Sequence, residues 1–160
     1  MKSQHVRSGS LESLRSLRRI HVKVDSLPSE VKAAGLSAQT LEQDILADLK
    51  EAPVGTLTEI GILHVRGKPT LHIRVSSFES ESGLCLYSII VELRESVYAK
   101  RLINPNVTEK DFPPPLIAPT WRVEALGAVP TDDLSSLKEE VSVLIGEFIK
   151  DLRSAKQDLS

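Results

Sequence analysis

Two successive runs of alternating residues constrain the fold of this chain more than any other feature. Apolar residues alternate with other residues over 70–78 and again over 84–93. A period of two is typical of strands that bury one face. A five-residue loop at 79–83 would join the strands as an antiparallel hairpin and bring both apolar sets to the same side. The pairs predicted by this loop are Leu71 with Val91, Ile73 with Ile89, and Val75 with Tyr87.

Other short runs add strands to this hairpin. Alternation over 20–25 and over 120–129 predicts two more strands, the second with Trp121 and Val123 directed inward. Residues 57–65 predict a further strand before the hairpin, and the pattern leaves its pairing register open. We therefore expect a mainly antiparallel sheet of four or five strands.

Two apolar stripes with helical spacing predict the helices. The first helix begins after Ser37, whose hydroxyl is suited to cap it, and ends at Pro53. The second begins near Thr131 and carries its stripe as far as Leu152. The expected architecture is a two-layer α+β fold in the order β-α-β-β-β-loop-β-α, with both helices packed on one face of the sheet.

Charge and apolar content divide the 160 residues into three parts. Residues 1–19 hold five basic residues against one acidic, although the whole chain has a net charge of -2. We expect a basic flexible arm over 1–19, a single domain over 20–156 and a disordered tail over 157–160. No apolar run has the length of a membrane-spanning helix, so we expect no such segment.

The sequence shows no motif of a common enzyme or cofactor site. Its four histidines have no accompanying set of metal ligands, residues 61–69 miss the spacing of a phosphate-binding loop, and no nucleophile elbow occurs. The single cysteine, Cys85, is at an apolar strand position, where a thiol usually serves packing. We therefore predict a protein that is not an enzyme and has no catalytic, cofactor or metal site.

Three groups of residues are candidates for binding. Four apolar residues interrupt the sheet face turned away from the helices, namely Phe78, Leu84, Leu86 and Ile90. They are the preferred surface for a protein partner or for self-association, and cover by the arm or by the proline-rich loop is the alternative explanation.

Trp121 and Arg122 follow a proline-rich loop at 100–119 and would wall a pocket beneath it. Arg15, Arg18 and Arg19 are candidates for contact with an anionic membrane or nucleic acid. Six aromatic residues and a slightly negative chain nevertheless argue against nucleic acid as the partner.

The preferred function is therefore a non-enzymatic protein-binding or assembly module. The first alternative is a small-ligand-binding protein or enzyme with its pocket under 100–119. The second is a protein that binds anionic membrane or nucleic acid through its arm.

Segments from four parts of the chain resemble an uncharacterised family of small bacterial envelope proteins. They are VKVDSLPSEVKAAGLSAQTLEQDILADLKEA, LYSIIVELRESV, APTWRVEALGAV and LKEEVSVLIGEFIKDLRSA, which together span most of residues 20–156. Members of this family look exported. The resemblance thus implies a periplasmic or envelope location if a signal sequence precedes this chain, and a cytoplasmic one otherwise. It implies no catalytic residues.

Overall fold

The hairpin inferred from alternation lies at the centre of the sheet. In the computed structural model, which describes residues 3–157, β4 (Thr70–Glu79) pairs antiparallel with β5 (Leu84–Val97). The apolar sets of both strands turn to the same side, as predicted. The pairing is displaced by two residues, however, so that Ile73 lies opposite Val91 and Val75 opposite Ile89. Because the displacement is even, it leaves every side chain on its predicted face.

The complete sheet has six strands of both orientations. Their order across the sheet is β1-β6-β5-β4-β2-β3. On one side of the hairpin, β6 (Leu116–Pro130) pairs antiparallel with β5, and β1 (Gln4–Gly9) pairs antiparallel with β6. On the other side, β2 (Arg19–Val24) pairs parallel with β4, and β3 (Gly55–Leu57) pairs parallel with β2. The predicted sheet of four or five mainly antiparallel strands, in the order β-α-β-β-β-loop-β-α, was therefore wrong.

One reason for the difference is the segment predicted as a strand over 57–65. It ends as β3 at Leu57 and continues into the short 3-10 helix η1 (Gly61–His64). The Thr58 hydroxyl accepts the Gly61 N–H at 3.0 Å and so stabilises the turn that leads into η1. Ile62 is buried by this turn rather than by a strand.

The other reason is the N-terminal segment. Residues 1–19 were expected to form a flexible arm, whereas residues 4–9 form β1 at the edge of the sheet. The following short helix α1 (Glu12–Arg15) and the turn after it bury Leu14 and Leu17. Of the predicted tail over 157–160, only Gln157 lies within the described residues, at the end of a helix.

Residues 3–157 form four α-helices rather than the two that were expected. Of the two expected helices, α3 (Ala38–Leu49) lies close to its predicted position and α4 (Leu137–Gln157) begins six residues after Thr131. The short helices α1 and α2 (Ser29–Ala33) are additional. The Ser37 hydroxyl caps α3 by accepting the Thr40 N–H at 3.0 Å, as predicted. Ahead of α4, the 3-10 turn η4 (Thr131–Ser136) occupies the residues where this helix was expected to begin.

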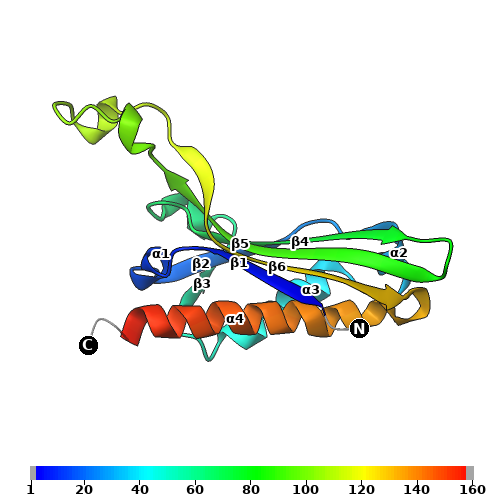
Figure 1. The fold of residues 1–160 in the computed structure, drawn as a ribbon. Coiled ribbons are helices and arrows are strands. Elements are labelled where there is room, and N and C mark those ends of the chain that lie inside the picture. Colours follow the sequence, from blue (N-terminus) through cyan, green and yellow to red (C-terminus); the bar gives the residue numbers. More distant parts are fainter. Residues whose placement is uncertain (1–2, 158–160) are drawn as a thin grey trace.

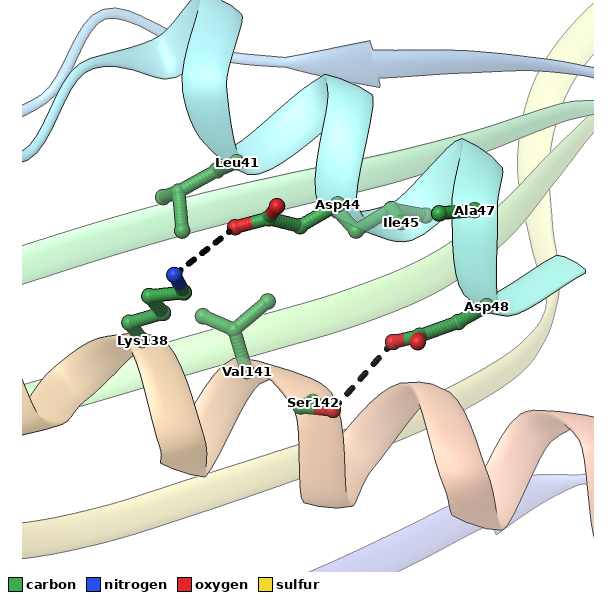
Figure 2. Close-up of a pocket in the computed structure, with 8 residues that line it drawn as sticks. All are labelled: Leu41, Asp44, Ile45, Ala47, Asp48, Lys138, Val141 and Ser142. Carbon is green, nitrogen blue, oxygen red and sulfur yellow. Dashed lines mark hydrogen bonds and ion pairs between the residues drawn. The ribbon is translucent and has the colours of Figure 1, made fainter.

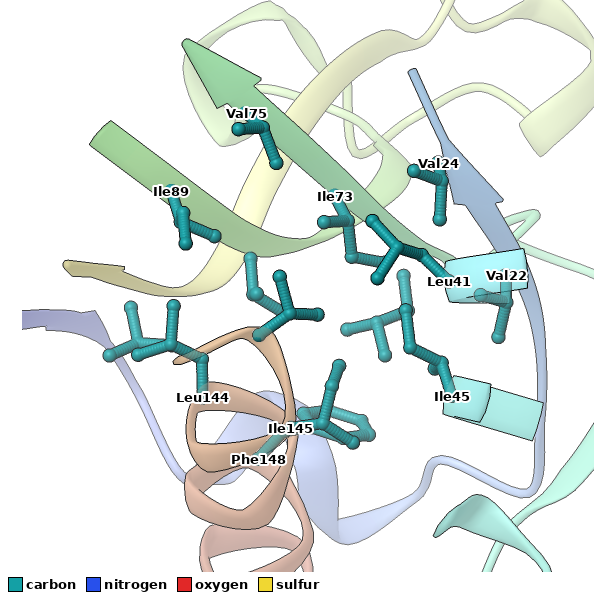
Figure 3. Packing of buried hydrophobic residues seen from close by; sticks show 14 of the residues in the cluster. Val22, Val24, Leu41, Ile45, Ile73, Val75, Ile89, Leu144, Ile145 and Phe148 are labelled. Carbon is teal, nitrogen blue, oxygen red and sulfur yellow. The ribbon is translucent and has the colours of Figure 1, made fainter. Parts of the chain in front are cut away.

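The apolar sides of α3 and α4 cover one face of the sheet (Figure 1). Figure 3 shows Leu41 and Ile45 of α3 and Phe148 of α4 meeting Ile73 and Ile89 of the sheet. This layer is the hydrophobic core, and burial of such side chains is the main force that holds the fold together. Within residues 3–157, none of the helices has the length and apolarity needed to cross a membrane.

Strands β5 and β6 continue beyond the other strands as a two-stranded hairpin arm, residues 94–119, which begins at an irregularity between Leu93 and Arg94. Its tip carries the short turns η2 (Lys100–Leu102) and η3 (Glu109–Asp111). The arm projects away from the body of the protein (Figure 1, upper left). The proline-rich loop is thus part of this projection.

Candidate functional site

The face of the sheet opposite α3 and α4, here called the open face, has a graded composition. The register of β4, β5 and β6 aligns its side chains in rows across the three strands. From the β4–β5 turn toward the hairpin arm, these rows are Phe78, Leu86 and Ala128; Ser76, Ser88 and Leu126; Arg74, Ile90 and Glu124; and His72, Glu92 and Arg122. The face therefore changes from apolar to charged along the strands.

The apolar end of the open face consists of Phe78, Leu84, Leu86 and Leu126. Their exposed fractions are 67%, 38%, 50% and 45%. Neither the N-terminal segment nor the proline-rich loop covers them, because the first forms an edge strand and the second lies in the hairpin arm. Clustered apolar side chains left in water are characteristic of interaction surfaces.

Three of the four residues predicted for this surface lie together. Phe78 and Leu86 are direct neighbours across the ladder, and Leu84 is two residues from Leu86 on the same strand. Ile90 is separated from them, half-buried between Arg74 and Glu124. The sequence analysis missed Leu126, although it directed Trp121 and Val123 of the same strand inward, and alternation then puts Leu126 on the outward side.

The charged end of the open face is a connected set of ion pairs. The His72 Nε2–H donates to Asp25 Oδ1 at 2.7 Å, and the Arg94 Nε–H donates to Glu92 Oε1 at 2.6 Å. His72 and Glu92 are buried, with exposed fractions of 7% and 3%. Buried polar and charged side chains of this kind need such partners to offset their lost hydration.

Neighbouring side chains also stabilise the Glu124 carboxylate. Arg122 donates an Nη2–H to Glu124 Oε2 at 2.8 Å, and the Ser88 hydroxyl donates to Oε1 at 3.0 Å. The hydrogen bond from Arg122, assisted by the one from Ser88, lowers the pKa of Glu124 because both favour its ionised form. The carboxylate thus serves to hold the strands and their side chains in place.

This set contains a histidine and carboxylates, the groups of an acid–base site, but these side chains are paired with one another or with arginines. His72 Nδ1 is buried without a hydrogen-bond partner among the described residues, 3.8 Å from Glu92 Oε1. Cys85 lies on the covered face, where burial raises the pKa of its thiol. Across residues 3–157, no group of three or more His, Cys, Asp or Glu side chains is placed to hold a metal ion.

The predicted groove residues Trp121 and Arg122 lie on opposite faces of the sheet. Trp121 is 1% exposed, its Nε1–H donates to Asp151 Oδ2 at 2.9 Å, and its ring meets Phe148 edge to face. Arg122 lies on the open face. The two residues therefore line no common pocket, and the loop at 100–119 does not enclose one with them.

The three arginines predicted to contact anions are not brought together into one cluster. Arg15 Nη1 donates to Glu12 Oε1 at 3.2 Å within α1. Arg18 and Arg19 are exposed, and Arg19 is the first residue of β2.

A cavity of about 240 Å³ lies along the seam between α3 and α4 (Figure 2). The Lys138 ammonium and the Asp44 carboxylate approach to 3.4 Å across it, and the Ser142 hydroxyl donates to Asp48 at 3.2 Å. Its polar groups join the two helices to each other, so we assign this seam a structural role.

Comparison with known proteins adds little to this geometry. No family model matches the chain, and no curated protein matches it in sequence. One similar solved structure is a dodecamer of a PelC variant from Paraburkholderia phytofirmans, with 12% identity and a TM-score of 0.48 over 94% of this chain and 98% of that one. A likeness this weak supports no conclusion about function, and the resemblance to envelope proteins stays a prediction.

Proposed function

We propose that this protein is a non-enzymatic binding or assembly module that docks another protein on the apolar end of its open face. The observation that carries the proposal is the exposed pair Phe78 and Leu86, which face each other across the β4–β5 ladder. The solvent face of a sheet is normally polar. The gathering of exposed apolar residues at one end therefore points to a purpose other than folding.

The position of the apolar end favours access by a large partner. It lies at the β4–β5 turn, whereas the hairpin arm leaves the sheet at the opposite end (Figure 1). Projecting segments of the chain thus leave this end free.

The neighbouring row defines the chemistry of the partner. Ser76 and Ser88 border the apolar end and carry hydroxyls rather than charges. A suitable partner surface is therefore apolar, with uncharged hydrogen-bonding groups at its rim. A second copy of this chain has that chemistry, so self-association is the form to test first. Four exposed side chains form a small contact, which favours a weak or transient complex unless the partner also contacts neighbouring elements.

The test compares two double variants of the full chain by sedimentation velocity over a range of concentrations. Phe78→Ser/Leu86→Ser removes the apolar pair, and Leu102→Ser/Leu116→Ser removes two exposed leucines of the hairpin arm as a matched control. We expect the wild type and the control to associate and the first variant to stay monomeric. Its midpoint of thermal unfolding should equal that of the wild type at dilutions where the wild type is monomeric. Cross-linking in the native cell extends the test to a different protein partner.

The proposal is overturned if the wild type stays monomeric and cross-links to no protein that Phe78→Ser/Leu86→Ser loses. Equal loss in the control variant would also contradict it, since the contact would then involve the hairpin arm.

A further inference from the structure

A second hollow lies beside the charged end of the open face. It has a volume of about 320 Å³, enough for a small organic molecule. Its lining comes from β2, β4 and β5, from η1 and the turns on either side of it, and from Ile117 of the hairpin arm. Segments far apart in the chain thus converge around one space.

Positive groups dominate this lining. Lys23, Lys68 and Arg94 contribute three cations against the single carboxylate of Glu59, although the whole chain has a net charge of -2. A concentration of one sign in a concave surface attracts ligands of the other sign.

Two of these three cations, Lys23 and Lys68, are uncommitted, and the third is committed only in part. Among residues 3–157, the ammonium groups of Lys23 and Lys68 make no hydrogen bond or ion pair, and Arg94 engages only its Nε, with Glu92. The nearby carboxylates do not neutralise the lysines, because Asp25 pairs with His72 and Glu92 with Arg94. The lining therefore holds donors that are available to a ligand.

Two further features of this lining are the backbone conformation of Lys68 and the free ring nitrogen of His21. Lys68 has a φ of 45°, a left-handed conformation that costs free energy at a residue other than glycine. The His21 Nδ1–H donates to the Leu57 carbonyl at 3.0 Å, which leaves Nε2 of this lining residue for another partner.

The remaining wall is apolar. Ile62 is buried under the turn, whereas Leu63 and Ile117 are 61% and 66% exposed. Exposed apolar side chains beside uncommitted cations match a ligand that has both a charged and an apolar part.

We propose that this hollow binds a small organic anion. Its carboxylate or phosphate group contacts Lys23, Lys68 and Arg94, and its apolar ring or chain lies against Leu63 and Ile117. The inference does not depend on the proposed docking function, which uses the other end of the open face.

Thermal unfolding of the full chain tests this site with three probes: benzoate, its neutral analogue benzyl alcohol, and inorganic phosphate. We expect benzoate at about ten times its dissociation constant to raise the midpoint of the wild type by about 4 °C. Benzyl alcohol should produce no such rise. Lys23→Gln/Lys68→Gln should abolish the benzoate effect, whereas Lys50→Gln/Lys110→Gln, which removes two exposed lysines elsewhere, should preserve it.

The two lysine double variants also separate specific binding from the general stabilising effect of phosphate as a salt. The salt effect would be the same in both variants, whereas specific binding is lost only in Lys23→Gln/Lys68→Gln. The site is overturned if benzoate leaves the wild-type midpoint unchanged and phosphate produces no rise that Lys23→Gln/Lys68→Gln abolishes. It is also overturned if benzoate raises the midpoint equally in Lys23→Gln/Lys68→Gln. A rise with phosphate that needs both lysines, without any rise with benzoate, overturns the apolar part of the proposal. Phe78→Ser/Leu86→Ser should respond to benzoate as the wild type does, so failure of one proposal is distinguishable from failure of the other.

Discussion

The two faces of the sheet are built from the same strands but differ in how they use apolar residues. On the covered face, Ile73, Ile89 and Val123 are fully buried under α3 and α4. On the open face, apolar residues gather at the β4–β5 turn, and ion pairs occupy the other end. The comparison indicates that the covered face supplies the stability of the fold, which leaves the open face available for binding.

The largest expected effect compares two residues of β5 that lie on opposite faces. Ile89→Ala should lower the free energy of unfolding by about 2–5 kcal/mol, because it leaves a cavity under the helices. Leu86→Ala, measured at protein concentrations where the chain is monomeric, should change it by no more than about 0.5 kcal/mol, since half of that side chain is already in water. Urea denaturation of both variants measures the difference.

Similar losses in both variants would break the comparison. They would mean that Leu86 is covered in solution, for instance by a second copy of the chain. Repeating the measurement at several protein concentrations identifies that case, because the stability of an associated state depends on concentration.

The predictable parts of the fold are those governed by local periodicity. Alternation placed Leu71, Ile73 and Val75 on the buried side, and helical spacing placed the stripe of α4, because each pattern needs only neighbouring residues. The positions of β2 and β3 depend instead on parallel pairing through a helical crossover, which no local pattern reveals.

The incorporation of β1 is a similar case. Its side chains are exposed, so it lacks the alternation of a half-buried strand. It is held by ladder pairs with β6 and by charge pairs with α4, including Arg7 with Asp151. The segregation of basic residues at the N-terminus and acidic residues in the body was the available signal.

The candidate binding sites also divide into a part that local periodicity predicts and a part that depends on contacts between distant segments. Phe78, Leu84 and Leu86 could be predicted as outward-facing because they belong to the hairpin. The hollow lined by Lys23, Lys68 and Arg94 could not, since it forms where β2, β4, β5 and the turns around η1 meet.

The second prediction compares two carboxylates: Asp151 of α4, on the covered side of the sheet, and Glu124 on the open face. Asp151 is 4% exposed and accepts hydrogen bonds from the Trp121 indole and from Arg7, both at 2.9 Å. Asp151→Ala should cost about 2–3 kcal/mol, because it leaves the buried indole N–H unpaired. Glu124→Ala on the open face should cost about 1 kcal/mol or less, since its partners Arg122 and Ser88 reach water.

Chemical denaturation combined with the near-ultraviolet signal of Trp121 measures both variants. A cost for Glu124→Ala as large as that for Asp151→Ala would show that the open face also contributes substantially to the stability of the fold.

The smallest expected effect concerns β1, which links the two faces: Val6 turns to the open face, and His5 turns to α4. The two ring nitrogens of His5 lie 2.9 Å from Glu147 Oε1 and 2.7 Å from Glu140 Oε1. Hydrogen bonds to Glu147 and Glu140, in that order of importance, raise the pKa of His5 above its ordinary value, because they favour the doubly protonated ring.

A raised folded-state pKa sets the direction of the pH dependence. The stabilisation by His5 is fully present below about pH 6.5, the ordinary pKa of histidine, and is lost as the pH rises through the raised value. His5→Gln should therefore lower the free energy of unfolding at pH 6, by less than about 1 kcal/mol for such a partly exposed pair, and have little effect at pH 9. His64→Gln, which replaces an exposed histidine without a partner among residues 3–157, is the matched control and should leave the free energy of unfolding unchanged. Hydrogen exchange of the β1 amides should accelerate with His5→Gln at pH 6, because the lost pairs hold that strand against α4. Equal effects of His5→Gln at both pH values would mean that the charge of His5 does not contribute to holding β1 against α4.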